Sequence, residues 1–465
     1  MLAAADVLCQ RLRPALLCGM IVFAPWAFGS TEPWSIAIMN GAAYLAGALW
    51  VVACAAKWGR GWRPQWHSKV VMLAALCLFL LSYVLISALN AAAIYKPHEW
   101  RLEPLPHIPW LPHSYDAPST WAAFRVFVAL AFVFWSTWDW LSESRDPIVP
   151  GQAVPRVTSR LRTLLWVLCV NGALVSLEAI IQRTAGTPDL LFFRPTHDNY
   201  DAAAQFGPYA YRANGAQFLN LIWPVALGFW WWLHNDRTQS RVIRQCHHIL
   251  LACVFISAAG ALYSLSRGGA AVAALLLCAG AVLFAVKRHA STALRLGAVA
   301  ITTVTLAIGF YMSWEKLGRR FANSGPDFIS GRSETYALAV RMHDEHPVFG
   351  TGAGTFNYLF QLYRTSPDQY WPAQLHNDWL EFRITFGWIG FSAILAALLI
   401  ATLSWLRRGG VPRDALFLWL TTFALGGCLL HARFDFPLQI YSIQFVFVLL
   451  AAILFSSARH GPGRA

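Results

Sequence analysis

Long apolar stretches alternate with short polar segments along the whole chain, and a helix needs about 20 mainly apolar residues to cross a bilayer. This pattern predicts twelve membrane spans. They cover residues 15–31, 34–56, 70–90, 119–140, 163–182, 211–233, 249–266, 269–286, 296–313, 386–404, 414–431 and 440–456. The pattern therefore predicts an all-α polytopic membrane protein with a single membrane domain, 1–465, that includes one long loop at 314–385.

The basic residues orient these spans, because Lys and Arg gather in the cytoplasmic loops of membrane proteins. With the N-terminus inside, the inner segments hold 21 of the 36 Lys and Arg residues, whereas the short outer loops hold few. Both termini are then cytoplasmic. The segment 314–385 becomes a helical periplasmic loop between the ninth and tenth spans.

Composition agrees with a membrane protein and removes other classes. Hydrophobic residues make up 57% of the chain and charged residues 13%, whereas a soluble domain has about 45–50% and about 25%. The nine cysteines lie in spans or inner segments, so no disulfide framework is predicted. Because most of the net charge of +13 belongs to the inner loops, no nucleic-acid partner is needed to explain it.

Several arginines lie at the outer ends of spans or in the outer loops, where a charge at the membrane is costly and usually functional. Arginine suits phosphate because its planar fork donates two hydrogen bonds at once. Arg267 is followed by two glycines that let the backbone approach a headgroup closely. Alone, each arginine could anchor a helix or pair with an acid, but Arg212 and Arg267 together favour phosphate binding. The outer set is Arg212, Arg267, Arg332, Arg341, Arg383 and Arg433.

One histidine in the outer loop is a candidate base. The segment 374–390 predicts a helix that runs into the next span, with His376, Leu380 and Arg383 on one face. An imidazole suits general-base catalysis at neutral pH. Asp435, two residues after an outer arginine, could orient that arginine or a catalytic histidine, or form an ion pair at a helix end.

A second cluster of histidines has a metal-ligand spacing. His343 and His346 lie three residues apart near the end of a helix predicted within 331–350, before Pro347. The neighbouring Asp344 and Glu345 favour a solvated helix end over a metal site. We therefore predict no metal site and no cofactor.

Five segments resemble one known family. They are YRANGAQFLNLIWPVALG (211–228), SLSRGGAAVAALLL (264–277), RSETYALAVRMHDEHPVFGTGAGTFNYLF (332–360), LHNDWLEFRITFGWIG (375–390) and the Asp-Phe-Pro of HARFDFPLQ (431–439). With these motifs, which span about 200–440, the chain resembles the O-antigen ligase family of membrane glycosyltransferases. That family also includes O-antigen polymerases and protein O-oligosaccharyltransferases, and the motifs do not separate them.

The resemblance implies a GT-C-like enzyme of the bacterial inner membrane that works on its periplasmic face without a metal and with inversion. The implied partners are a glycan on undecaprenyl diphosphate as donor, lipid A–core oligosaccharide as acceptor, and membrane lipids. Arg267 and Arg212 would hold the diphosphate and His376 would activate the acceptor hydroxyl. The remaining candidates for substrate binding are Arg332, Arg341, Arg383, Arg433 and Asp435.

A transporter is the alternative from another class. A secondary transporter predicts paired polar interruptions near the middle of the bilayer in two related halves. The sequence shows no such pair, because its polar groups cluster at the outer face. The enzyme is therefore the leading prediction.

Overall fold

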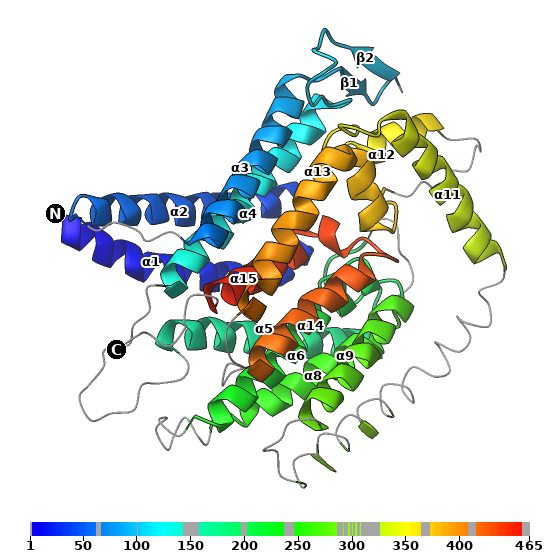
Figure 1. The fold of residues 1–465 in the computed structure, drawn as a ribbon. Helices are drawn as coiled ribbons and strands as arrows, with labels where there is room; N and C mark the ends of the chain where they lie inside the picture. Colours follow the sequence, from blue (N-terminus) through cyan, green and yellow to red (C-terminus); the bar gives the residue numbers. More distant parts are fainter. Residues whose placement is uncertain are drawn as a thin grey trace.

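The computed structural model describes most of the chain (Figure 1). The described residues are 2–61, 67–99, 101–142, 158–196, 202–236, 246–285, 326–363, 373–407 and 415–457, with scattered positions between 292 and 307. Over these residues the chain forms thirteen α-helices and one two-stranded sheet. The predicted helical membrane protein is confirmed at this level.

The helices follow the apolar stretches closely. The first group is α1 Leu2–Trp26, α2 Pro33–Trp58, α3 Ser68–Leu89, α4 Ala117–Ser142 and α5 Ser159–Ala185. The second is α6 Arg212–His234, α8 Ile249–Tyr263, α9 Arg267–Ala285, α11 Pro326–Glu345, α12 Phe356–Leu359, α13 Asp378–Leu403, α14 Ala415–His431 and α15 Tyr441–Ser457. Eleven of the twelve predicted spans fall on these helices. The span predicted at 296–313 falls largely outside the described residues.

Length and composition separate the described helices into groups. Seven are long and apolar enough to cross a membrane, namely α1 to α5, α9 and α13, and three shorter apolar helices are α8, α14 and α15. The chain is therefore a polytopic membrane protein. Helix α6 is outside both groups, because buried Asn214, Gln217 and Asn220 lower its mean hydropathy.

Helix α6 lies at the centre of the bundle. It packs against α5, α8, α9, α14 and α15, and nearly all of its residues are buried. A polar side chain in such a place needs a partner. The Asn220 side chain donates to the Gly269 carbonyl at 2.9 Å and accepts from the Trp223 indole at 3.2 Å. The polar positions of α6 therefore connect it to α9 and to its own next turn.

A buried ion cluster joins the middle of α1 to the ends of α2 and α4. Arg13 of α1 is fully buried and lies 2.8 Å from the Asp139 carboxylate of α4, which also lies 3.5 Å from Lys57 of α2. Breaking such a pair is expensive because it leaves an uncompensated buried charge. Two of the basic residues that the topology prediction places inside thus also hold helices together.

A small sheet departs from the all-α prediction. Strands β1 Ala93–Lys96 and β2 Arg101–Pro104 pair antiparallel, with Ala93 opposite Pro104. The segment lies between α3 and α4, outside the apolar stretches, and Ile94 and Tyr95 have side chains that favour strands. Span counting does not detect a hairpin of this size.

The segment after α11 is fixed onto a break in α13, which lies beside α11 (Figure 1). Gly387 interrupts α13 with φ 58° and ψ −172°. The Trp388 amide donates to the Pro347 carbonyl at 2.8 Å, and a Cβ on Gly387 would lie 2.3 Å from the Val348 carbonyl oxygen. Only glycine fits this approach. Helix α11 itself ends at Glu345, before Pro347 as predicted.

Candidate functional site

His376 lies just before α13 and not within it. Asn377 caps the helix, accepting from the Leu380 amide at 3.3 Å, and α13 begins at the next residue. The predicted shared helix face of His376, Leu380 and Arg383 is therefore wrong, because the helix begins only at Asp378, after His376. His376 also has φ +56°. This left-handed conformation costs a non-glycine residue about 1–3 kcal/mol and concentrates at functional sites.

The imidazole of His376 is held by a carboxylate. Its Nδ1 lies 3.0 Å from Asp435 Oδ1, and the Asp435 side chain is only 8% exposed. Asp435 Oδ2 accepts from the Tyr211 hydroxyl at 3.2 Å and lies 3.9 Å from His431 Nε2. Asp435 therefore connects its own segment, which includes His431, to two distant segments at Tyr211 and His376.

The protonation state of Asp435 sets the tautomer of His376. Burial alone would raise the pKa of Asp435, but the hydrogen bond from His376 and the attraction of His431 and His376 hold that pKa below its ordinary value. At neutral pH the carboxylate is ionised and can only accept. Nδ1 of a neutral His376 must then be the donor, so Nε2 carries the lone pair that a base requires.

The segment that carries Asp435 is bound to the first turn of α13. The Asp378 carboxylate accepts from the Leu438 amide at 2.8 Å and from the Gln439 side chain at 3.2 Å. The Asp378 amide in turn donates to the Ala432 carbonyl at 2.8 Å. These bonds fix the distance between His376 and Asp435. Sequence reasoning missed Asp378, although an acid directly after an Asn cap is a typical helix start.

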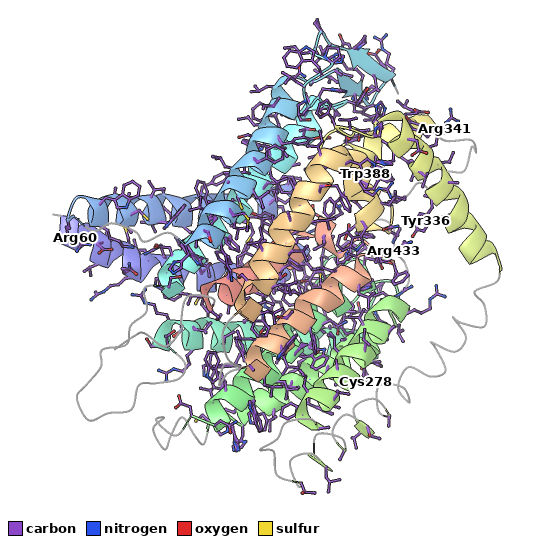
Figure 2. The ribbon with its side chains drawn as sticks, viewed as in Figure 1. Arg60, Cys278, Tyr336, Arg341, Trp388 and Arg433 are labelled. Atoms are coloured by element: carbon purple, nitrogen blue, oxygen red, sulfur yellow. The ribbon has the colours of Figure 1, made fainter. Side chains whose placement is uncertain are left out.

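Aromatic side chains surround His376. The Tyr336 hydroxyl of α11 donates to the His376 carbonyl at 3.0 Å. Tyr211 and Phe436 stack on each other at 5.2 Å and both meet the imidazole edge-on. Figure 2 places Tyr336 and Arg433, which is exposed two residues before Asp435, on the same side of the molecule. The ring is thus fixed in orientation while its side chain keeps 27% exposure.

Arg267 is connected to Asp435 through its neighbour Gly268, which contacts His431. Helix α9 begins at Arg267, and a Cβ added to Gly268 would lie 2.8 Å from His431 Nε2. His431 is buried, contacts Gln217 Oε1 at 2.9 Å through Nδ1, and faces Asp435 through Nε2. The start of α9 therefore touches the histidine that touches Asp435. Arg267, next to this contact, is half-buried.

Arg212 is connected to Asp435 through the preceding residue, Tyr211. It is the first residue of α6, half-buried, and donates to the Ala203 carbonyl at 2.8 Å, while the preceding Tyr211 binds Asp435. The structure thus brings Arg212, Arg267, His376 and Asp435 into one connected neighbourhood, as the predicted single outer site requires.

Arg183 is a buried arginine that sequence reasoning missed. It donates to the Ser264 carbonyl at 3.2 Å and to the Gln205 carbonyl, and its guanidinium lies 5.3 Å from the Phe206 ring. Ser264 precedes α9 and Gln205 precedes α6, so Arg183 ties together the segments that lead into both candidate phosphate-binding arginines. Its place directly after the span predicted at 163–182 was the available signal.

The remaining predicted arginines make other contacts. Arg341 is exposed on α11 and pairs with Glu345 at 3.2 Å. The guanidinium of Arg383 lies 4.4 Å from the Trp388 ring, further along α13. Arg332 belongs to α11, and its side chain is outside the described part of the chain. Their substrate-binding roles stay predictions.

The histidines near the end of α11 correct the expectation of a solvated helix end. His343 is 2% exposed and meets Trp388 edge-on at 5.5 Å. Burial, followed by the charge of Arg383, lowers the pKa of His343. His346 is half-buried and lies 3.3 Å from the Tyr115 hydroxyl. Only Asp344 and Glu345 are exposed as expected, because α13 covers the inner face of α11.

Fold and site together define a class: a polytopic membrane protein in which an Asp-bound histidine is connected, through Tyr211 and His431, to two helices that begin with arginine. Comparison with known families then identifies a domain. Residues 252–395, less than a third of the chain, match the family model described as O-antigen ligase. The matched family is one of glycan-transferring ligases and polymerases that use lipid-linked glycans. No curated protein matches the chain.

Proposed function

We propose that this chain transfers a glycan from undecaprenyl diphosphate to a hydroxyl of lipid A–core oligosaccharide at the periplasmic face of the bacterial inner membrane. The observation that carries the proposal is the contact between His376 and ionised Asp435, connected through His431 to the start of α9 at Arg267. A base for an acceptor hydroxyl and a cation for a phosphate leaving group thus share one neighbourhood. The O-antigen ligase domain supplies the reaction class.

The reaction follows from the roles of these groups. Nε2 of His376 takes the proton of the acceptor hydroxyl as its oxygen attacks the anomeric carbon of the donor glycan. The bond from that carbon to the diphosphate oxygen breaks on the opposite face, which inverts the configuration. Undecaprenyl diphosphate leaves with the electron pair, and the imidazolium that forms is stabilised by Asp435, as in other base–carboxylate pairs.

The arginines stabilise the leaving group. Negative charge grows on the diphosphate as the glycosidic bond breaks, and fixed cations placed there lower the barrier without a metal. Arg267 at the start of α9 and Arg212 at the start of α6 supply these cations, and Arg183 holds the segments that precede both helices. Helix N-termini add a favourable partial charge for phosphate.

The acceptor separates this proposal from its neighbours in the family. Purified chain in lipid nanodiscs would receive a polyprenyl-diphosphate glycan with lipid A–core, a second lipid-linked glycan or an acceptor protein in parallel. We expect transfer to lipid A–core that His376→Ala and Arg267→Ala each lower by about 10²-fold or more. Product only on the second lipid-linked glycan would instead indicate a polymerase, and product only on protein an O-oligosaccharyltransferase.

The transporter alternative has a test of its own. Liposomes that contain the chain would be assayed for solute and ion flux and for glycan transfer. Flux that is unaffected by His376→Ala, with no transfer to any acceptor, would refute the enzymatic proposal.

A further inference from the structure

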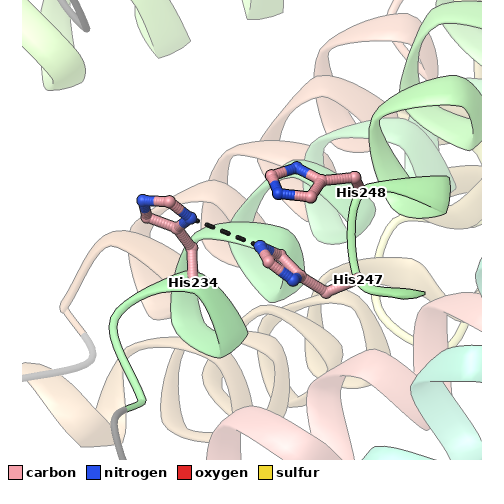
Figure 3. Close-up of side chains that lie close together, drawn as sticks. All are labelled: His234, His247 and His248. Carbon is pink, nitrogen blue, oxygen red and sulfur yellow. Dashed lines mark hydrogen bonds between the residues drawn. The ribbon is translucent and has the colours of Figure 1, made fainter. Parts of the chain in front are cut away.

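A second group of imidazoles lies at the other end of α6. His234 is the last residue of that helix, and His247 and His248 immediately precede α8. Figure 3 shows the three rings facing one another across the α6–α8 connection. One ligand atom from each residue lies within 4.8 Å of the ligand atoms of the other two. Arg212 starts α6, so this histidine triad is about 33 Å from it along the helix axis.

We propose that the histidine triad, His234, His247 and His248, binds a Zn²⁺ ion that joins the end of α6 to the start of α8. Imidazole nitrogen is a preferred zinc ligand, and sites with three histidines leave a fourth position for water. Nothing in the transfer chemistry proposed above uses these residues. The inference therefore stands or fails independently of that function.

The distance between the first two ligands fits a metal. Zinc–nitrogen bonds of about 2.0–2.1 Å at a tetrahedral angle separate two nitrogens by roughly 3.3–3.4 Å. His234 Nδ1 and His247 Nε2 lie 3.3 Å apart. A hydrogen bond between the two rings has the same separation and is drawn as a dashed line in Figure 3, so both nitrogens are already at the spacing that a shared ion requires.

Neighbouring side chains fix the rings of His234 and His247, whereas the ring of His248 is exposed. The buried His247 and the His234 ring both lie parallel to Trp230, at 6.5 Å and 5.3 Å between ring centres. His248 is exposed, with its ring centre 4.0 Å from that of His247. Because His248 is exposed, its side chain can rotate toward the other two ligand atoms, which lie within 4.8 Å. The indole thus orients two ligands before a metal arrives.

The competing explanation is that the three rings simply pack on Trp230. Binding of Zn²⁺ alone to purified, chelator-treated protein distinguishes the two. The protein would carry an affinity tag without histidines, and Zn²⁺ would be titrated calorimetrically in detergent. We expect one Zn²⁺ per chain, and affinity at least about tenfold weaker in His234→Ala and in His248→Ala, since even indirect supports of a metal site are worth that much.

His67→Ala is the matched control, because His67 is exposed directly before α3 on the same predicted membrane face. Its affinity should equal that of the wild type. X-ray absorption of the zinc-loaded wild type should show nitrogen ligands at about 2.0–2.1 Å with imidazole scattering, a result that needs no variant to fold. Absence of stoichiometric zinc, or unchanged affinity in both triad variants, would overturn the proposal.

Discussion

Each end of α6 has a histidine nearby, but the two histidines have different partners. Near Arg212 at its start, the Nδ1 of His376 faces the carboxylate of Asp435 at 3.0 Å. At its end, the Nδ1 of His234 faces the imidazole of His247 at 3.3 Å. A carboxylate raises the basicity of a neighbouring imidazole, whereas a second imidazole adds a ligand atom for a shared metal ion. The partner, and not the histidine itself, separates the two proposed roles.

The largest expected effect is the loss of His376. Replacing it with Ala removes the base, and general-base catalysis is worth about 10²–10⁴-fold. We expect glycan transfer to fall by that factor in single-turnover assays with purified protein. His98→Ala is the control, since His98 is exposed in the β1–β2 turn. Wild-type rates in His376→Ala would remove the base from the account.

Arg267 comes next. Arg267→Ala should lower kcat by about 10²–10³-fold, because one fixed donor to developing charge is worth about 2.7–4 kcal/mol. Arg267→Lys should recover part of this, since it keeps the charge but loses the fork. Arg101→Ala, an exposed arginine of β2, is the matched control. A change in KM alone would limit Arg267 to ground-state binding.

Gly268 tests the contact between α9 and the Asp435 network. Gly268→Ala places a methyl group 2.8 Å from His431 Nε2, and overpacking of this kind costs about 1–3 kcal/mol. Thermal unfolding in detergent should show reduced stability, and transfer should fall with it. Gly426→Ala in α14, where a Cβ meets nothing within 4 Å, should not destabilise the protein. Equal behaviour of the two variants would contradict the packing.

Substitutions in the histidine triad at the end of α6 should change the rate of glycan transfer little. His234→Ala should change the transfer rate by less than about tenfold while it weakens zinc binding, since about 33 Å of helix separates it from Arg212. Parallel transfer and zinc-binding assays on one preparation measure both. A loss of transfer as large as that of His376→Ala would show that the two ends of α6 are not independent.

The smallest effect concerns pH. Because the pKa of Asp435 lies below its ordinary value in the folded protein, its contribution to stability is complete above the unfolded value of about 3.9 and is lost only as pH falls through the lower folded value. Between pH 7 and about pH 5 the carboxylate should stay ionised. Infrared difference spectra over that range should contain no protonated-carboxyl band that Asp435→Asn removes. Such a band would mean that the tautomer argument for His376 fails.

Most of the helices could be predicted, because membrane spans depend on the apolar character of single stretches. The span predicted at 211–233 corresponds to α6. The β1–β2 hairpin could not be predicted, since a pair of four-residue strands carries no comparable hydrophobic pattern. Orientation in the membrane stays a prediction.

The sequence could suggest the candidate residues of the site, but it could not show which of them contact one another. Arg212, Arg267 and His376 were identifiable from residue type and motif. The helix predicted over 374–390 placed His376 inside it, although Asn377 and the acids after it indicate a helix start. His431 is the last residue of one predicted span and Arg183 directly follows another, and only the tertiary structure shows that they connect Asp435, α6 and α9.

The most direct test of the central claim, that His376 and Asp435 act as one unit, is a double-mutant cycle on single-turnover glycan transfer with His376→Ala, Asp435→Asn and the combination. Residues that act together are strongly non-additive. We predict that the double variant is no slower than His376→Ala alone, because Asp435 acts through the imidazole. Losses that multiply in the double variant would contradict the account.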